Sequence, residues 1–190
     1  MPTIVLFHSV LGLRPVELRA ADRLRAAGHE VVTPDLYSGQ TASTIDEGFG
    51  VKDRIGWATI EQRARQAVDD LPADTVLAGM SMGAGVVSTL LPHRPDTAGV
   101  LLLHGLAAIP ATARGGLPVQ LHVSDTDDFA PPADVSTWLD AATRTGADAQ
   151  VFTYQHAGHF YTDTSLADHH EHATSLTWHR VLDFLRTLRR

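Results

Sequence analysis

A serine between two glycines is the residue of this sequence best placed for nucleophilic chemistry. The segment Gly79-Met80-Ser81-Met82-Gly83 has the pattern G-x-S-x-G, follows the apolar run Thr75–Ala78 and precedes a stretch with helical periodicity. A turn between a strand and a helix is the setting in which this pattern raises a serine hydroxyl above a sheet. Glycine at both outer positions removes side chains that would collide with neighbouring structure. The alternative is a glycine-rich turn whose serine only caps the helix.

A serine hydroxyl is a weak nucleophile until a base takes its proton. In proteins with this motif the partners follow in the order serine, acid, histidine. Among eleven histidines, His159 is the one that stands soon after the last apolar run, Gln150–Tyr154. Gly158 is expected to let the backbone turn so that the imidazole reaches back over the sheet. We therefore predict that His159 is the general base.

The acid that orients this histidine is expected after the preceding apolar run, Val119–Val123. Three carboxylates compete there, Asp125, Asp127 and Asp128. The spacing favours Asp127, which opens the pattern D-x-x-(small apolar)-P before the next helix, and Asp125 is the next choice. A carboxylate in this role fixes the imidazole tautomer and stabilises the imidazolium.

Two backbone amides are expected to hold a developing oxyanion. The helix after Ser81 directs its N-terminus at the serine, which makes the Met82 N–H one donor. The second donor is expected in the loop after the first apolar run, and we assign it to the Val10 N–H. Substrate contacts are predicted for Ser9, Leu11, Tyr37 and Phe160. For His8 and Ser9, packing inside the protein is an equal alternative.

Apolar runs that alternate with helical segments predict the scaffold that positions these groups. The runs are Thr3–His8, Glu30–Thr33, Thr75–Ala78, Gly99–Leu103, Val119–Val123 and Gln150–Tyr154; the helical segments are Pro15–Ala27, Gly56–Asp70, Met82–Leu91, Pro132–Thr145 and His172–Leu188. Such alternation is typical of an α/β protein with a mostly parallel sheet, here of about six strands, and helices on both faces. Ligands of such sheets bind beyond the carboxyl ends of the strands.

One long connection does not fit this alternation. Residues 35–55 hold three glycines and scattered polar residues, together with Tyr37 and Phe49, and Trp57 stands just beyond. A connection of this length is usually functional or mobile. It is either a surface loop folded on its own side chains or a wall of the substrate pocket. By contrast, only 104–118 separate two later runs, too few residues for a large lid.

Length and composition exclude several classes of protein. The 190 residues suffice for a single domain spanning 1–190, the net charge of −7 argues against nucleic-acid binding, and the absence of cysteine excludes disulfides and a cysteine nucleophile. No apolar run is long enough to span a membrane, and the N-terminus lacks the basic region and cleavage site of a signal peptide, so we expect a cytoplasmic protein, monomer or homodimer. The cluster Asp168–His172 invites a metal hypothesis, but it lacks HExxH spacing, and we expect neither metal nor organic cofactor.

These motifs together resemble the dienelactone hydrolase family of α/β-hydrolases over nearly the whole chain. The resemblance rests on four segments: Pro34-Asp35-Leu36-Tyr37, the elbow Gly79–Gly83, the stretch His122–Pro131 that places the acid at Asp127, and Ala157-Gly158-His159. The resemblance implies a compact α/β-hydrolase fold with the triad Ser81, Asp127 and His159.

Three departures from the founding members bear on chemistry. Those members have cysteine where this chain has Ser81, and a glutamate where it has Ser9. That glutamate is tied to switching the thiol to a thiolate, so a serine variant has no use for it. They also bind the substrate carboxylate through an arginine at the position of Asp163. A carboxylate there predicts neutral rather than anionic substrates.

We therefore expect a serine hydrolase that cleaves a small to medium ester or lactone through an acyl-enzyme. One alternative is an inactive α/β-hydrolase fold that serves as a binding module. Another is acyl transfer or thioester cleavage by the same triad, since fold and triad do not separate these reactions.

Overall fold

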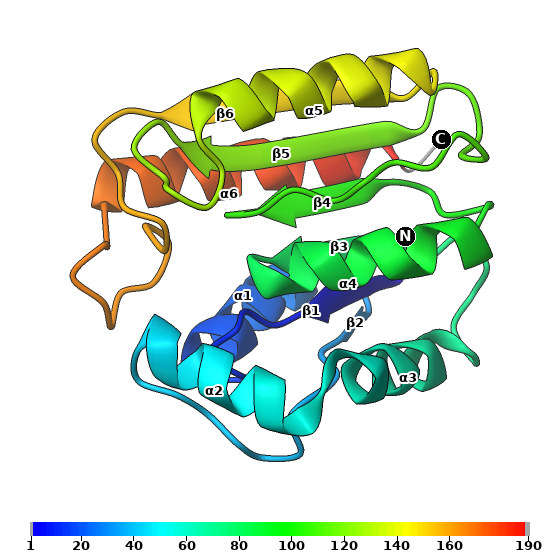
Figure 1. Ribbon diagram of the computed structural model, residues 1–190. Helices are drawn as coiled ribbons and strands as arrows, with labels where there is room; N and C mark the ends of the chain where they lie inside the picture. Colours follow the sequence, from blue (N-terminus) through cyan, green and yellow to red (C-terminus); the bar gives the residue numbers. More distant parts are fainter. Residues whose placement is uncertain (1, 189–190) are drawn as a thin grey trace.

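The computed structural model describes residues 2–188 and is built on one six-stranded parallel sheet (Figure 1). The strand order is β2-β1-β3-β4-β5-β6. The strands are β1 (Ile4–Phe7), β2 (Val31–Val32), β3 (Val76–Met80), β4 (Val100–Leu103), β5 (Pro118–Ser124) and β6 (Asp148–Tyr154). Each strand coincides with a run predicted from the sequence, which confirms the predicted sheet.

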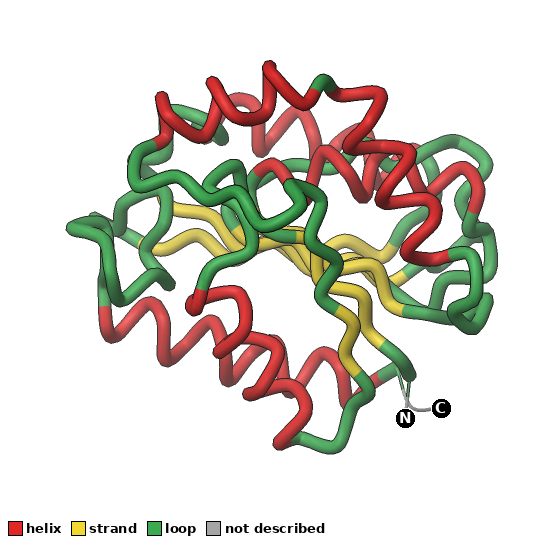
Figure 2. The backbone as a smooth tube through the Cα atoms, turned by 90° about the horizontal axis from the view of Figure 1, so that it is seen from below, coloured by secondary structure: helices red, strands yellow, loops and turns green. Residues whose placement is uncertain are grey.

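Helices cover both faces of this sheet, as Figure 2 shows from below. On one face lie α1 (Pro15–Ala26) and α6 (Glu171–Thr187), whose buried side chains pack with Ile4, Val76 and Leu101. On the other lie α3 (Trp57–Val68), α4 (Met82–Leu90) and α5 (Pro132–Arg144). A short 3-10 turn, Leu91–His93, follows α4. The inner strands are apolar on both sides because each side meets a helix layer.

The register of the parallel strands brings their carboxyl ends to one edge. Phe7 pairs with Gly79, Met80 with Leu103, and Ser124 with Tyr154. The loops that follow β1, β3, β5 and β6 therefore meet at that edge, where sheets of this type place their ligands.

The segment 35–55 contains a helix that the sequence interpretation missed, α2 (Ile45–Ile55). The Thr44 hydroxyl accepts a hydrogen bond from the Glu47 N–H and caps the helix, and the Glu47 carboxylate accepts one from the Ser43 N–H at 2.9 Å. Gly48, which lowers helix propensity, is required by packing, because a Cβ there would lie 2.6 Å from the Val10 carbonyl oxygen. Tertiary packing therefore outweighs the low intrinsic propensity of this segment.

Residues 104–117, between β4 and β5, form no helix or strand, and no large lid covers the carboxyl edge of the described chain. In residues 2–188, no helix is both long enough and apolar enough to cross a membrane.

Candidate active site

The turn from β3 into α4 holds Ser81 in a strained backbone conformation. Its φ is 52° and its ψ −110°, a region that residues other than glycine rarely adopt. The two glycines permit the turn: a Cβ on Gly79 would lie 2.6 Å from the Ala84 nitrogen, and one on Gly83 would collide with the Phe7 carbonyl. The close approach of α4 to β3 and β1 thus raises the serine above the sheet edge.

The structure brings the three predicted triad residues together. Ser81 Oγ lies 2.9 Å from His159 Nε2, and His159 Nδ1 lies 2.7 Å from Asp127 Oδ2. An ionised carboxylate only accepts hydrogen bonds, so Nδ1 carries the proton and donates it to Asp127. Nε2 is then free to accept the Ser81 hydroxyl proton. This is the geometry and tautomer that general-base activation of a serine requires.

Asp127 is held in place by the backbone of its own turn. It is buried, and its second oxygen, Oδ1, accepts a hydrogen bond from the Phe129 N–H at 2.8 Å. The competing carboxylates have other positions: Asp125 accepts from the His156 N–H at 2.9 Å, and Asp128 is exposed. Of the three candidates, Asp127 alone reaches His159.

The loop that carries His159 is held by the close approach of the half-buried Asp168. The Asp168 carboxylate accepts a hydrogen bond from the Phe160 N–H at 3.0 Å. A Cβ on Gly158 would lie 2.6 Å from the Asp168 Cγ. The need for glycine here differs from the sequence interpretation, because Gly158 is not among the residues with positive φ. It makes room for a carboxylate rather than for a backbone turn.

The two amides assigned to the oxyanion border the same cavity. Val10 and Met82 both line it, and neither N–H donates a hydrogen bond to another described group. Gly48 of α2 lies against the Val10 carbonyl and limits movement of the loop. Both donors are thus available to a ligand beside Ser81.

His8 orients the first of these amides, a role that the sequence did not reveal. The Leu36 N–H donates to His8 Nε2 at 3.1 Å, so the ring proton must be on Nδ1, which donates to the Ser9 carbonyl at 2.7 Å. The Gly12 N–H donates to that same carbonyl at 3.1 Å. In a trans peptide the C=O and N–H point in opposite directions. Fixing the Ser9 carbonyl therefore aims the Val10 N–H away from it.

Burial suits His8 to this task. The ring is fully buried, and desolvation lowers its pKa in spite of the Ser9 hydrogen bond and the charge of Asp35, both of which raise it. It also makes a T-shaped contact with the Tyr37 ring, with centroids 4.8 Å apart. Because its pKa is lowered, His8 favours the neutral form, and its two hydrogen bonds place the ring proton on Nδ1.

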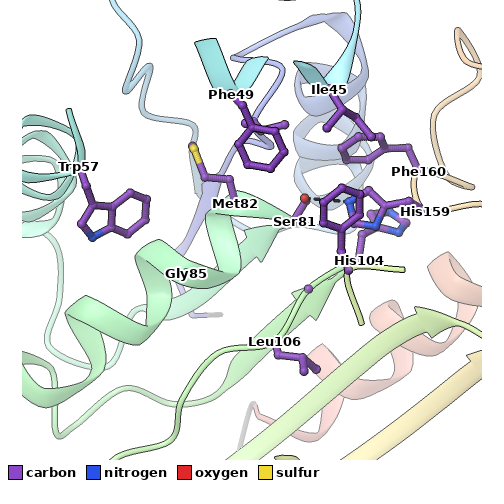
Figure 3. A pocket seen from close by; sticks show the side chains of 13 residues that line it. Ile45, Phe49, Trp57, Ser81, Met82, Gly85, His104, Leu106, His159 and Phe160 are labelled. Atoms are coloured by element: carbon purple, nitrogen blue, oxygen red, sulfur yellow. Dashed lines mark hydrogen bonds between the residues drawn. The ribbon is translucent and has the colours of Figure 1, made fainter. Parts of the chain in front are cut away.

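A pocket of about 340 Å³ opens beside Ser81. Figure 3 shows its wall: α2 supplies Ile45 and Phe49, the start of α3 supplies Trp57, and α4 supplies Met82 and Gly85. The remaining lining residues are Val10, Ser81, His104, Gly105, Leu106, Phe129, His159 and Phe160. None of these described residues is Asp, Glu, Lys or Arg. The segment 35–55 therefore contributes a wall of this pocket.

The residues predicted to contact substrate divide into two groups. Phe160 lines the pocket and packs edge-on against His159, with ring centroids 4.3 Å apart. Ser9, Leu11 and Tyr37 are buried behind the lining. The Tyr37 hydroxyl donates to the Met82 sulfur at 3.1 Å, so Tyr37 supports the pocket wall instead of facing a ligand, and burial raises its pKa.

Ser9 and Leu11 have structural roles as well. Ser9 Oγ donates to Glu17 Oε1 at 3.0 Å and accepts from the Leu11 N–H at 3.3 Å. Leu11 packs with Val10 and Phe160 in a small apolar cluster. We therefore assign no direct substrate contact to Ser9, Leu11 or Tyr37.

Asp163 does not face the pocket, which changes the reason for expecting neutral substrates. It is buried and forms an ion pair with Arg14, with 2.6 Å between Nη2 and Oδ2. Burial alone would raise its pKa, but hydrogen bonds from Ser165 and Arg14 outweigh that effect and lower it. The charge of Asp163 is thus balanced by Arg14. The argument against anionic substrates must come from the uncharged pocket lining.

Two other places contain histidine: the pocket wall, at His104, and the cluster Asp168–His172. His104 lines the pocket, its Nε2 is 2.7 Å from Thr162 Oγ1, and burial holds its pKa well below the ordinary value. At the cluster Asp168–His172, and elsewhere in residues 2–188, no three His, Asp or Glu side chains gather as a metal site would require.

Comparisons with known proteins agree with this architecture. Residues 1–189 match the dienelactone hydrolase family. A solved dienelactone hydrolase-like promiscuous phosphotriesterase from metagenomic libraries is 18% identical, with a TM-score of 0.79 over 99% of this chain and 87% of that one.

Two solved esterases are also similar. Esterase PE8 is 19% identical, with a TM-score of 0.66 over 98% of this chain and 92% of its own. A thermophilic esterase from the Planctomycetes species Thermogutta terrifontis is 15% identical, with a TM-score of 0.68 over 99% and 82%. At these identities the likenesses show a shared fold. Among curated proteins, none matches this sequence.

Proposed function

We propose that this chain, which belongs to the dienelactone hydrolase family, hydrolyses small to medium esters or lactones with Ser81 as its nucleophile. Family membership makes it a hydrolase that cleaves ester bonds. The observation that carries the nucleophile assignment is the continuous hydrogen-bond chain from Ser81 Oγ through His159 to Asp127.

The chemistry follows from the roles of these groups. His159 Nε2 takes the hydroxyl proton as Ser81 Oγ attacks the ester carbonyl, and Asp127 stabilises the imidazolium that forms. The Val10 and Met82 amides hold the oxyanion, and one such donor is worth about 3–4 kcal/mol of barrier. His159 then protonates the leaving alkoxide, which leaves an acyl-enzyme on Ser81. Water activated by the same nitrogen releases the acid.

The decisive experiment is labelling by a fluorophosphonate, read by intact-protein mass. We expect one adduct on the wild-type protein and none on Ser81→Ala. Ser175→Ala is the matched control, since Ser175 lies on the exposed face of α6 and its loss should leave the adduct in place. An adduct on folded Ser81→Ala, or none on folded wild-type protein, would refute the nucleophile assignment.

The same labelling separates the inactive binding module from an enzyme, because a module without an activated serine takes no adduct. Acyl transfer or thioester cleavage is tested by adding alcohol or thiol acceptors to an ester assay. For a hydrolase we expect free acid to remain the main product when the acceptor is added. For an acyltransferase we expect the new ester or thioester to become the main product.

A further inference from the structure

An apolar groove leads from Ser81 along α4 to Trp57, and nothing in the triad chemistry accounts for it. Figure 3 shows His159 on one side of Ser81, and Met82, Phe49 and Trp57 on the other. Four large apolar side chains of the described chain are exposed, and three of them, Phe49, Trp57 and Phe129, line this pocket. Clustered exposed apolar surface of this kind marks a binding site.

The position of His159 decides which part of an ester enters the groove. The leaving oxygen must lie near His159 Nε2, because that nitrogen gives it a proton. The leaving group therefore lies on the His159 side, beside Phe160 and Phe129. The acyl group points the other way, along α4 toward Trp57.

Gly85 forms the floor of this groove. It stands one helical turn beyond Ser81, and a Cβ placed there would meet only Trp57, 3.4 Å from Cη2 and 3.9 Å from Cζ2. The absence of a side chain at Gly85 leaves the space between Ser81 and Trp57 open. The indole then closes the far end.

Helix geometry sets the length of the groove. Four residues of α-helix rise about 6 Å, and an extended chain covers about 3.5 Å in three bonds, so about five bonds reach from the carbonyl carbon to the level of Gly85. An atom at the Cβ position of Gly85 is in van der Waals contact with the Trp57 ring. That length corresponds to a hexanoyl group or a short aryl-substituted acyl group. A charged acyl group would lose its hydration there without an ionic partner, because no described lining residue carries a full charge.

We propose that this groove is the acyl site, that it takes an uncharged acyl group no longer than an extended hexanoyl chain, and that Gly85 and Trp57 set this limit. The inference rests on the proposed serine hydrolase function. It narrows the substrate class to esters of medium-length aliphatic or arylalkanoic acids.

The test uses p-nitrophenyl esters from acetate to decanoate. A fully buried methylene raises kcat/KM about fourfold, and a half-open groove about twofold, so we expect a rise of about tenfold or more from acetate to hexanoate. We expect no further rise at octanoate. A monoester of glutaric acid, with a free carboxylate on its acyl chain, should react at least tenfold more slowly than pentanoate.

Two variants move the limit in opposite directions. Gly85→Val fills the floor and should lower the hexanoate-to-acetate ratio of kcat/KM at least tenfold. Trp57→Ala opens the end and should raise the decanoate-to-hexanoate ratio at least fivefold. Ala58→Val, at an exposed neighbour outside the pocket, is the matched control and should change neither ratio.

The outcomes separate the two levels of inference. A wild-type protein that takes the fluorophosphonate label and turns over acetate, but whose ratios stay within twofold in both groove variants, refutes the acyl site alone. A folded wild-type protein with neither label nor turnover refutes the proposed function and the acyl site with it. If Gly85→Val fails to fold, judged by circular dichroism, Trp57→Ala decides.

Discussion

A pair of substitutions at His8 tests whether the oxyanion amide is set by the imidazole beneath it. The Asn side-chain nitrogen is two bonds from Cβ, as is His Nδ1, so His8→Asn keeps the donor to the Ser9 carbonyl and loses the acceptor for Leu36. The Gln side-chain oxygen is three bonds from Cβ, as is His Nε2. His8→Gln therefore keeps the acceptor for Leu36 and loses the donor to Ser9.

The structure gives different magnitudes for catalysis and for stability. Losing one oxyanion donor outright costs about 10²- to 10³-fold in kcat. In His8→Gln the Gly12 N–H still holds the Ser9 carbonyl, so we expect a partial loss of about 10- to 100-fold. In His8→Asn we expect kcat within about threefold of wild type. Each variant leaves a buried group less satisfied, which costs about 1–3 kcal/mol of unfolding free energy.

The assay is steady-state hydrolysis of p-nitrophenyl hexanoate, with thermal unfolding measured in parallel. An oxyanion donor acts in the transition state, so kcat should fall in His8→Gln while KM changes little. At about 2–4 °C per kcal/mol, both variants should lose a similar few degrees of Tm. Equal kcat in the two variants, or a loss of kcat that follows Tm alone, would refute the orienting role of His8.

Three other changes probe the framework around the triad. Asp127→Asn keeps the shape but favours the wrong imidazole tautomer, so kcat should fall about 10⁴-fold with Tm nearly unchanged; a loss under tenfold would contradict the role of Asp127. Asp163→Asn removes the nearer of the two buried carboxylates beside Arg14, leaving Glu17 at 3.8 Å, and should cost about 3 kcal/mol at neutral pH in urea unfolding. Because the pKa of Asp163 is lowered in the folded state, the pair stabilises the protein above its ordinary pKa of about 4. That stability is lost as the pH falls through the folded pKa, so the Tm of the variant should vary less than that of wild type between about pH 5 and pH 3; parallel Tm profiles would count against this. Gly158→Ala would push its Cβ into Asp168 and displace the loop that carries His159. We expect kcat to fall about tenfold or more, and the unfolding free energy measured by chemical denaturation to fall by about 1–3 kcal/mol. A fully active, equally stable variant would contradict this steric argument.

The sheet was predictable because each strand is a nearly continuous apolar run between helical segments. The helix α2 was harder, since Gly48 and Gly50 weaken its pattern. A capping signal was nevertheless present, a threonine followed three residues later by Glu47. What the sequence could not supply is the reason for Gly48, because the contact with Val10 exists only after folding.

In the site, too, some residues were predictable from the sequence and some contacts were not. The order serine, acid, histidine and the strand ends predicted which three side chains the structure brings together. The role of His8 depends on Leu36, and the pairing of Asp163 on Arg14, and neither partner can be identified from local spacing. The single domain, the cytoplasmic location and the choice between monomer and homodimer stay predictions.

The ion pair of Arg14 with Asp163 also bears on how the protein is synthesised. The two residues are 149 positions apart in the chain, so the contact closes a very large loop and forms only when most of the chain is present. His159 emerges from the ribosome just before Asp163, long after Ser81. A nascent chain that ends before residue 159 therefore contains Ser81 without its predicted base. Under the proposed mechanism, such a chain has no group that can take the Ser81 proton, so the triad is assembled only after nearly the whole chain has been synthesised.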